Sequence, residues 1–127
     1  MNPSINHIAI YVYDLQKSSS FYKNIMQFEK IDEPFKDGRH DWYKIGEHSQ
    51  LHIISGNIKD QSHEKNVHLA FTVPSLDKFI AHLEKEKINF SNWAGDIKGP
   101  NLRPDGIKQI YFQDPDGYWI EVNDDKY

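Results

Sequence analysis

The side chains best able to do chemistry in this sequence are imidazoles and carboxylates. The 127 residues include seven histidines and no cysteine. Disulfides, thiolate metal sites and cysteine nucleophiles are therefore excluded, and nitrogen and oxygen donors remain. Where several such donors converge, they suit a divalent metal ion.

An internal repeat relates two of these histidines. Residues 5–15 and 66–76 match with a shift of 61, which places His7 on His68. Both segments are rich in β-branched and aromatic residues and end in turn-forming residues, so each is predicted to be a strand. The two halves of the chain are therefore predicted to share one design.

Aligning the last strand predicted in each half places His52 on Glu121. Because side chains alternate along a strand, both donors face away from their apolar neighbours. If the two copies pack with pseudo-two-fold symmetry, four donors converge. We predict that these four bind a divalent metal (Zn, Ni, Mn, Fe or Co): His7, His52, His68 and Glu121.

The elements between these strands have the same order in both halves. Apolar residues at helical spacing predict a helix over residues 18–26 and a second one from Leu76, with Ser75 as its N-cap. Three strands are predicted after each helix, at residues 28–35, 41–45 and 50–55 and at residues 88–93, 107–112 and 118–123. We expect a single α+β domain over residues 1–127, with βαβββ modules at about 4–56 and 66–124 and a linker at about 57–65.

Together, the repeat and its motifs resemble the vicinal oxygen chelate superfamily over almost the whole chain. The superfamily includes glyoxalase I, fosfomycin-resistance enzymes, bleomycin-binding proteins, methylmalonyl-CoA epimerase and extradiol dioxygenases. The motifs that carry the resemblance are Asn-His-Ile-Ala-Ile-Tyr-Val-Tyr-Asp-Leu at 6–15, Ser-Ser-Phe-Tyr at 19–22, Val-His-Leu-Ala-Phe-Thr-Val at 67–73 and Asp-Pro-Asp-Gly-Tyr-Trp-Ile-Glu at 114–121. The resemblance implies tandem βαβββ modules that form a cupped mixed β-sheet around the metal, commonly in a homodimer whose site draws ligands from one chain or from both.

The resemblance also implies a function. We expect a glyoxalase I-like lyase or isomerase that acts on a small oxygenated metabolite through a metal-stabilised enediolate or oxyanion. Glu121, the carboxylate among the four donors, is then the candidate catalytic base. Two alternatives stay open: an Fe(II) ring-cleaving dioxygenase of the extradiol type, and a non-catalytic, ligand-binding antibiotic resistance protein of the bleomycin type.

Some positions depart from the patterns of individual members. Glyoxalase I usually has Glu at the position of His52, and its glutathione-binding arginine corresponds to Tyr11, so glutathione use is not implied. Fosfomycin-resistance enzymes share His7, His68 and Glu121 but carry a non-ligand at the position of His52. A thiol-transferase role is therefore expected less than a lyase or isomerase role.

Outside the four donors, we predict substrate contacts and surface positions. The candidate substrate-binding residues are Tyr11, Trp93, Lys98 and Arg103, of which the last two lie in a Gly/Pro-rich loop at residues 96–106. The remaining histidines, without a donor at the equivalent repeat position, are expected at the surface: His40, His48, His63 and His82.

Composition limits the partners. A net charge of −4 and a pI near 5.9 disfavour nucleic acid, which is bound through a basic surface. No run of about 18 apolar residues suggests a membrane span, and the first residues lack the pattern of a signal peptide. We expect a cytoplasmic protein that acts on a small molecule.

Overall fold

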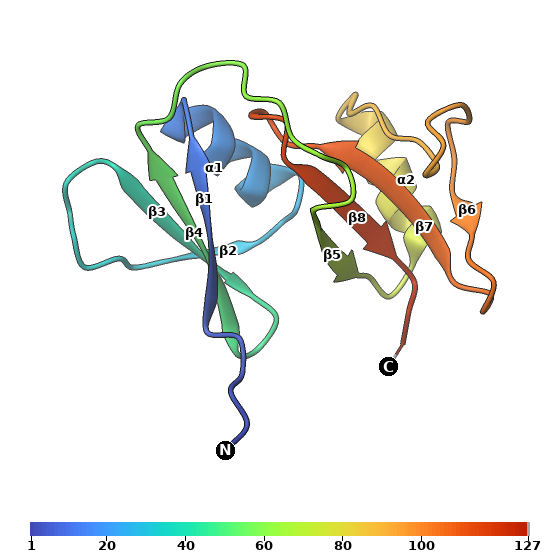
Figure 1. The fold of residues 1–127 in the computed structure, drawn as a ribbon, viewed down its shortest axis with the longest axis horizontal. Helices are drawn as coiled ribbons and strands as arrows, with labels where there is room; N and C mark the ends of the chain where they lie inside the picture. The colour runs from blue at the N-terminus through green and yellow to red at the C-terminus, as the bar shows by residue number, and fades with distance from the viewer. Residues whose placement is uncertain (127) are drawn as a thin grey trace. The chain divides into compact units, whose positions relative to one another are not determined.

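The computed structural model describes residues 1–126. The chain forms two compact units. Unit one is Met1–Gln61 and unit two begins at Ser62. Each unit contains one four-stranded sheet and one helix (Figure 1). The expected α+β class and the βαβββ module used twice are therefore confirmed.

Unit one has a mixed sheet in the order β1-β4-β3-β2. The first strand runs parallel to β4, and the other neighbours are antiparallel. Its elements are β1 (His7–Val12), α1 (Leu15–Asn24), β2 (Glu29–Ile31), β3 (His40–Ile45) and β4 (Ser49–Ser55). Because the first and last strands of the module are neighbours in the sheet, residues far apart in the sequence lie side by side.

Unit two repeats this topology in the order β5-β8-β7-β6, with β5 parallel to β8. The remaining pairs, β8–β7 and β7–β6, are antiparallel. Its elements are β5 (His68–Thr72), α2 (Leu76–Lys85), β6 (Asn101–Leu102), β7 (Lys108–Gln113) and β8 (Trp119–Asn123). The N-cap predicted for its helix is confirmed, because the Ser75 side chain accepts a hydrogen bond from the Lys78 amide.

Each sheet has an apolar face and a polar face. In unit one, α1 packs against β3 and β4, and the strand residues turned away from solvent include Val12, Leu51 and Ile53. In unit two, the ring of Phe79 on α2 lies 6.2 Å from that of Phe112 on β7. Strand alternation therefore leaves the predicted donors on the sheet face opposite each helix.

Two predicted strands differ from the structure. No strand forms over residues 88–93, where only Ser91 makes a bridge, to Tyr111. The Asn92 side chain accepts hydrogen bonds from the amides of Gly95 and Ile97, and this local turn takes the chain away from the sheet. The strand predicted over 28–35 is confined to Glu29–Ile31.

Helix α1 begins earlier than the spacing predicted. Asp14, taken from the sequence as the turn after the first strand, is its N-cap and accepts a hydrogen bond from the Lys17 amide. The predicted loop over 96–106 also contains the short strand β6.

Neither helix in the described residues is both long and apolar enough to cross a membrane.

Candidate functional site

Both units position their predicted donors by the same strand register. In unit one, Ala9 on β1 lies opposite His52 on β4. In unit two, Ala70 on β5 lies opposite Glu121 on β8. His7 and His68 are each two residues before these alanines, so each first-strand histidine shares a face with the donor on the neighbouring strand. The repeat inferred from the sequence is therefore present in the hydrogen-bonded register.

The donors in unit two lie side by side on the neighbouring strands β5 and β8. His68 Nε2 lies 3.4 Å from Glu121 Oε1, and the carboxylate side chain is 7% exposed. The backbone of this pair is held by the parallel β5–β8 ladder. A nearly buried carboxylate is costly unless it is hydrogen-bonded, paired or bound to a metal.

Hydrogen bonds from three side chains orient the Glu121 carboxylate. The Tyr111 hydroxyl donates to Oε1 over 2.8 Å, and Gln109 and Asn123 donate to Oε2 over 3.1 and 2.7 Å. Burial, and then the bond to Glu121, raise the pKa of the Tyr111 phenol well above its ordinary value, so this group stays a donor. The carboxylate is thus held in place by uncharged donors.

The His68 ring is oriented by the backbone. Its Nδ1 lies 2.9 Å from the carbonyl oxygen of Lys65, which can only accept, so Nδ1 carries the proton. In the neutral ring the lone pair of Nε2 then faces the carboxylate of Glu121, and two lone pairs repel each other unless a proton or a cation lies near both. Metal-binding histidines are typically held in this way by a carbonyl at the other ring nitrogen.

The spacing of this pair also fits a metal. With bonds of about 2.0–2.1 Å, two ligands of a tetrahedral ion lie roughly 3.3 Å apart. The observed 3.4 Å between His68 Nε2 and Glu121 Oε1 is close to that value. Imidazole and carboxylate together suit a divalent ion of borderline hardness. The residues present in unit two therefore fit the metal that the resemblance implies.

The donors in unit one are arranged as a stack of rings. The imidazoles of His7 and His52 are 4.0 Å apart between centroids with 13° between their planes. On its other side His52 lies on Trp42, at 3.7 Å and 1°. His52 is 8% exposed, and its Nε2 donates to Gln50 Oε1 over 2.8 Å. Burial, and then the rings of His7 and His40, lower the pKa of His52, so it is held neutral.

Parallel stacking limits what these two imidazoles can bind together. A ring nitrogen donates to a metal in the plane of its ring, and the planes of His7 and His52 lie side by side. Their lone pairs therefore do not converge on one ion at the ordinary bond length of about 2.0–2.1 Å. His7 keeps a free lone pair on Nε2, because its Nδ1 is bonded to Asn6 Oδ1 over 2.7 Å.

Among residues 1–126, no group of three or more His, Asp or Glu side chains is close enough to hold a metal. Within each unit the predicted donors come together as a pair. The pair in unit two has the spacing of metal ligands, and the pair in unit one has the spacing of stacked rings.

The four predicted substrate residues have different surroundings. Trp93 lies beside the unit two pair, with its ring 6.3 Å from that of His68 and 5.2 Å from that of Tyr111. Tyr11 is on the polar face of unit one and is 45% exposed. The ammonium of Lys98 lies over the Phe90 ring at 5.6 Å.

Arg103 is engaged in ion pairs. Its guanidinium contacts Asp105 at 2.5 Å and Asp125 at 3.2 Å, and these carboxylates raise its pKa further. The same pairing lowers the pKa of Asp105 to about 2. A substrate anion would compete with both carboxylates, so binding by Arg103 stays a prediction.

Three of the four histidines expected at the surface are less exposed than predicted. His40 is the first residue of β3, bonds to Asp37 over 2.9 Å and stacks on Phe35 at 4.5 Å. His63 stacks on Tyr118 at 4.0 Å, and its buried Nε2 has no hydrogen-bond partner. His48 is exposed as predicted, and His82 is half-buried on α2.

The residues that hold the unit two pair in place were not predicted from the sequence. These are Tyr111, Gln109 and Asn123 around Glu121, and Lys65 beside His68. A signal existed for three of them, because Tyr111 and Gln109 alternate along one predicted strand and Asn123 follows Glu121 by two. Lys65 precedes the strand, and no periodicity marks it.

Comparison with known proteins agrees with this architecture. The metallothiol transferase FosB of Staphylococcus epidermidis is 28% identical and aligns over 94% of this chain and 80% of its own length. A lactoylglutathione lyase of Pseudomonas putida is 23% identical over 92% of this chain and 82% of its own length.

A solved structure from Bacillus anthracis, described as a glyoxalase family protein, superposes with a TM-score of 0.78 at 25% identity. It covers 99% of this chain and 98% of that one. Residues 4–122 match the Glyoxalase/Bleomycin resistance protein/Dioxygenase superfamily. With the repeated βαβββ topology and nearly the whole length matched, the chain belongs to that superfamily.

Proposed function

We propose that this chain is an enzyme that depends on a divalent metal, with His68 and Glu121 as two of the ligands. The observation that carries the proposal is the 3.4 Å separation of His68 Nε2 and Glu121 Oε1, with the Nδ1 proton of His68 committed to a carbonyl. Bound there, a divalent ion supplies Lewis-acid polarisation of a substrate oxygen.

His7 and His52 in unit one stay predicted metal ligands, and their surroundings favour one of them over the other. His7 is exposed and has a free Nε2 lone pair, whereas His52 is buried in the stack and bonded to Gln50. We therefore favour His7 as the ligand from this unit and His52 as its packing partner. Ligation by His52 requires its ring to leave Trp42.

The surroundings of Glu121 favour a ligand role over a proton-transfer role. A general base must move a proton to and from an accessible oxygen. Both oxygens of Glu121 already accept hydrogen bonds, and the side chain is nearly buried. The base of a lyase or isomerase mechanism would then have to be another group.

A ligand role for Glu121 ranks two candidate reactions. Transfer of a thiol to a small oxygenated substrate requires the metal and an external nucleophile, and a metallothiol transferase is 28% identical to this chain. We place this reaction first. A glyoxalase-like lyase or isomerase reaction, for which a lactoylglutathione lyase is the relevant relative, comes second because it requires a base.

The first test is the metal content of the purified protein, followed by titration of the metal-free protein with Zn²⁺, Mn²⁺, Ni²⁺ and Fe²⁺. We expect one metal per chain. A protein that retains none and binds none contradicts the proposal and favours the non-catalytic, antibiotic-binding alternative. Sedimentation of the loaded protein tests the predicted homodimer.

Activity assays then separate the reaction classes. The metal-loaded protein is incubated with fosfomycin and a low-molecular-weight thiol, with a hemithioacetal, and with catechols under oxygen. Thiol consumption supports the transferase, loss of the hemithioacetal supports the lyase or isomerase, and oxygen uptake supports the extradiol-type alternative. Turnover by metal-free protein in any assay would contradict metal dependence.

A further inference from the structure

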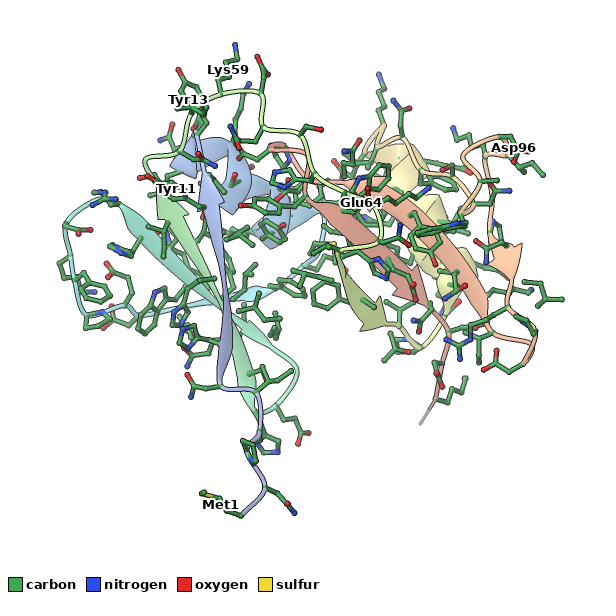
Figure 2. All side chains as sticks on the ribbon, in the orientation of Figure 1. Met1, Tyr11, Tyr13, Lys59, Glu64 and Asp96 are labelled. Atoms are coloured by element: carbon green, nitrogen blue, oxygen red, sulfur yellow. The ribbon has the colours of Figure 1, made fainter. Side chains whose placement is uncertain are left out.

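Lys65 has an environment unusual for a lysine that precedes a strand. It lies in the segment of residues 62–67, which precedes β5 and includes Glu64, labelled in Figure 2. Its ammonium donates to the Trp93 carbonyl over 2.6 Å. Three rings surround the ammonium, those of Trp119, Trp93 and Tyr111, with centroids at 4.8, 5.0 and 5.2 Å. An ammonium among aromatic faces is favoured by their negative quadrupoles, so its position is well defined.

The backbone of Lys65 reaches the first proposed ligand. Its carbonyl oxygen accepts the Nδ1 proton of His68 over 2.9 Å. Fixing the ammonium among the rings therefore also fixes the carbonyl that selects which nitrogen of His68 is free. The side chain of Lys65 makes the contacts with the rings, whereas its main-chain carbonyl makes the hydrogen bond to His68.

The backbone of Trp93 and a chain of hydrogen bonds connect the same ammonium to the second proposed ligand. The Trp93 amide donates to Asn101 Oδ1 over 2.9 Å, and Asn101 Nδ2 donates to Gln109 Oε1 over 3.0 Å. Gln109 Nε2 then donates to Glu121 Oε2 over 3.1 Å. Lys65 thus lies at the junction of two arms, one to His68 and one to Glu121.

The direction of this chain is fixed by its chemistry. A backbone amide can only donate, so Asn101 must accept with its oxygen and present its NH₂ to Gln109. Gln109 must then accept with its oxygen and present its own NH₂ to Glu121. A carboxylate, which can only accept, is the residue type that completes such a chain.

We propose that Lys65 is a positioning residue that holds both His68 and Glu121 in the geometry of metal ligands. The inference rests on the metal role proposed for these two residues. Asn101 is the first residue of β6 and follows the loop that begins at Asn92 (Figure 2 labels Asp96 in this loop). The Gly/Pro-rich segment therefore acts on the site through the Glu121 arm.

A simple charge effect would give the opposite result. A fixed cation near a divalent metal repels it, so removing the charge of Lys65 should tighten metal binding if charge were its only influence. Loss of positioning should weaken metal binding instead. Changing residues that hold metal ligands in place typically costs about 10–100-fold in affinity.

The test compares Lys65→Met with Lys85→Met in the full chain. Lys85 is an exposed lysine at the end of α2, on the side of the sheet opposite the donors, and it controls for loss of a lysine charge in the same unit. Zn²⁺ affinity is measured by competition with a chromophoric chelator, and the protonation of the His68 nitrogens is read from ¹⁵N chemical shifts of the metal-free protein. We expect Lys65→Met to bind Zn²⁺ about 10–100-fold more weakly, and His68 to lose its preference for a proton on Nδ1, while Lys85→Met changes neither.

A second variant separates the two arms. Asn101→Ala should weaken Zn²⁺ binding and leave the ¹⁵N shifts of His68 unchanged, since it interrupts only the Glu121 arm. Equal or tighter Zn²⁺ binding by Lys65→Met, with an unchanged His68 spectrum, overturns the inference. If Lys65→Met does not fold, unchanged affinity in Asn101→Ala overturns it instead. If the unaltered protein binds no metal, the proposed function fails, and the His68 spectrum still decides whether Lys65 positions that ring.

Discussion

Units one and two share a topology and a strand register but differ in what surrounds the paired donors. The strand neighbour of His52 is Trp42, and the neighbour of Glu121 at the equivalent place is Tyr111. An indole offers a flat face, on which His52 stacks, whereas a phenol offers a hydroxyl, which donates to Glu121. One pair of positions therefore produces ring packing in unit one and an oriented carboxylate in unit two.

This difference indicates that two donors at matching positions of the repeat need not have the same role. His52 and Glu121 occupy matching positions, and both are nearly buried. Only Glu121 is surrounded by donors that leave it as an oriented anion, while His52 is held neutral among rings. The largest expected effects on metal binding therefore come from unit two.

The strongest test of the difference is Glu121→Gln. The amide removes the negative charge and presents an NH₂ group to side chains that themselves donate, so metal affinity should fall by more than about 100-fold, beyond the cost of changing a residue that only supports a ligand. Leaving buried donors unpaired should also lower the free energy of unfolding by about 1–3 kcal/mol. Chelator competition and urea denaturation measure the two effects. Glu84→Gln, on the exposed side of α2, is the matched control, and metal binding equal to that control would remove Glu121 from the site.

The sequence predicts the features of this site that depend on local alternation along a strand better than those that depend on contacts between side chains of different strands. The repeat and strand alternation predict that His52 and Glu121 occupy matching positions and face away from their apolar neighbours. The register that places them opposite Ala9 and Ala70 is known only from the structure, because alternation along one strand does not specify its partner. The stacking of His52 on Trp42 does not follow, since alternation fixes the face of a side chain and not its rotamer.

Local side-chain hydrogen bonds explain the errors in the predicted elements. The strand predicted over 28–35 ends early because Glu33 accepts from the amides of Phe35 and Lys36 and turns the chain. The strand predicted over 88–93 fails for the related reason at Asn92. The aromatic surroundings of Lys65 could not be predicted because Trp93, Tyr111 and Trp119 come from three separate segments.

A second prediction compares the two units by replacing one histidine of each with glutamine, in His68→Gln and in His52→Gln. We expect His68→Gln to lower metal affinity by more than tenfold, since it removes a ligand, and His52→Gln to leave affinity within a few-fold of the unaltered protein. His52→Gln should instead lower the free energy of unfolding by about 0.5–1.5 kcal/mol through lost stacking, and His52→Phe should recover most of it. Loss of metal in His52→Phe equal to that in His68→Gln would show that His52 is a ligand.

A third prediction uses a buried tyrosine in each unit. Tyr111→Phe removes one of three donors to Glu121, so we expect about tenfold weaker metal binding and a loss of about 0.5–1.5 kcal/mol in the free energy of unfolding. Tyr43→Phe removes a hydroxyl bonded to the side chain and carbonyl of Ser19, at 2.5 and 3.0 Å. It should lower stability similarly without changing metal affinity. Equal affinities in the two variants would mean that the Tyr111 hydroxyl does not support the ligand.

The smallest expected effect is a pH dependence of stability that comes from unit one. Because the pKa of His52 is lowered in the folded protein, the unfolded chain takes up this proton first as the pH falls below about 6.5. The contribution of His52 to stability is therefore full above that pH and decreases as the pH falls from there toward the folded-state pKa. His52→Phe should flatten this part of the curve, measured as the free energy of unfolding between pH 7.5 and about pH 5, whereas His48→Phe, at an exposed position, should not. A curve that keeps its slope in His52→Phe would mean that the ring stack does not hold His52 neutral, and the distinction between a packed imidazole in unit one and an oriented anion in unit two would then rest on Glu121 alone.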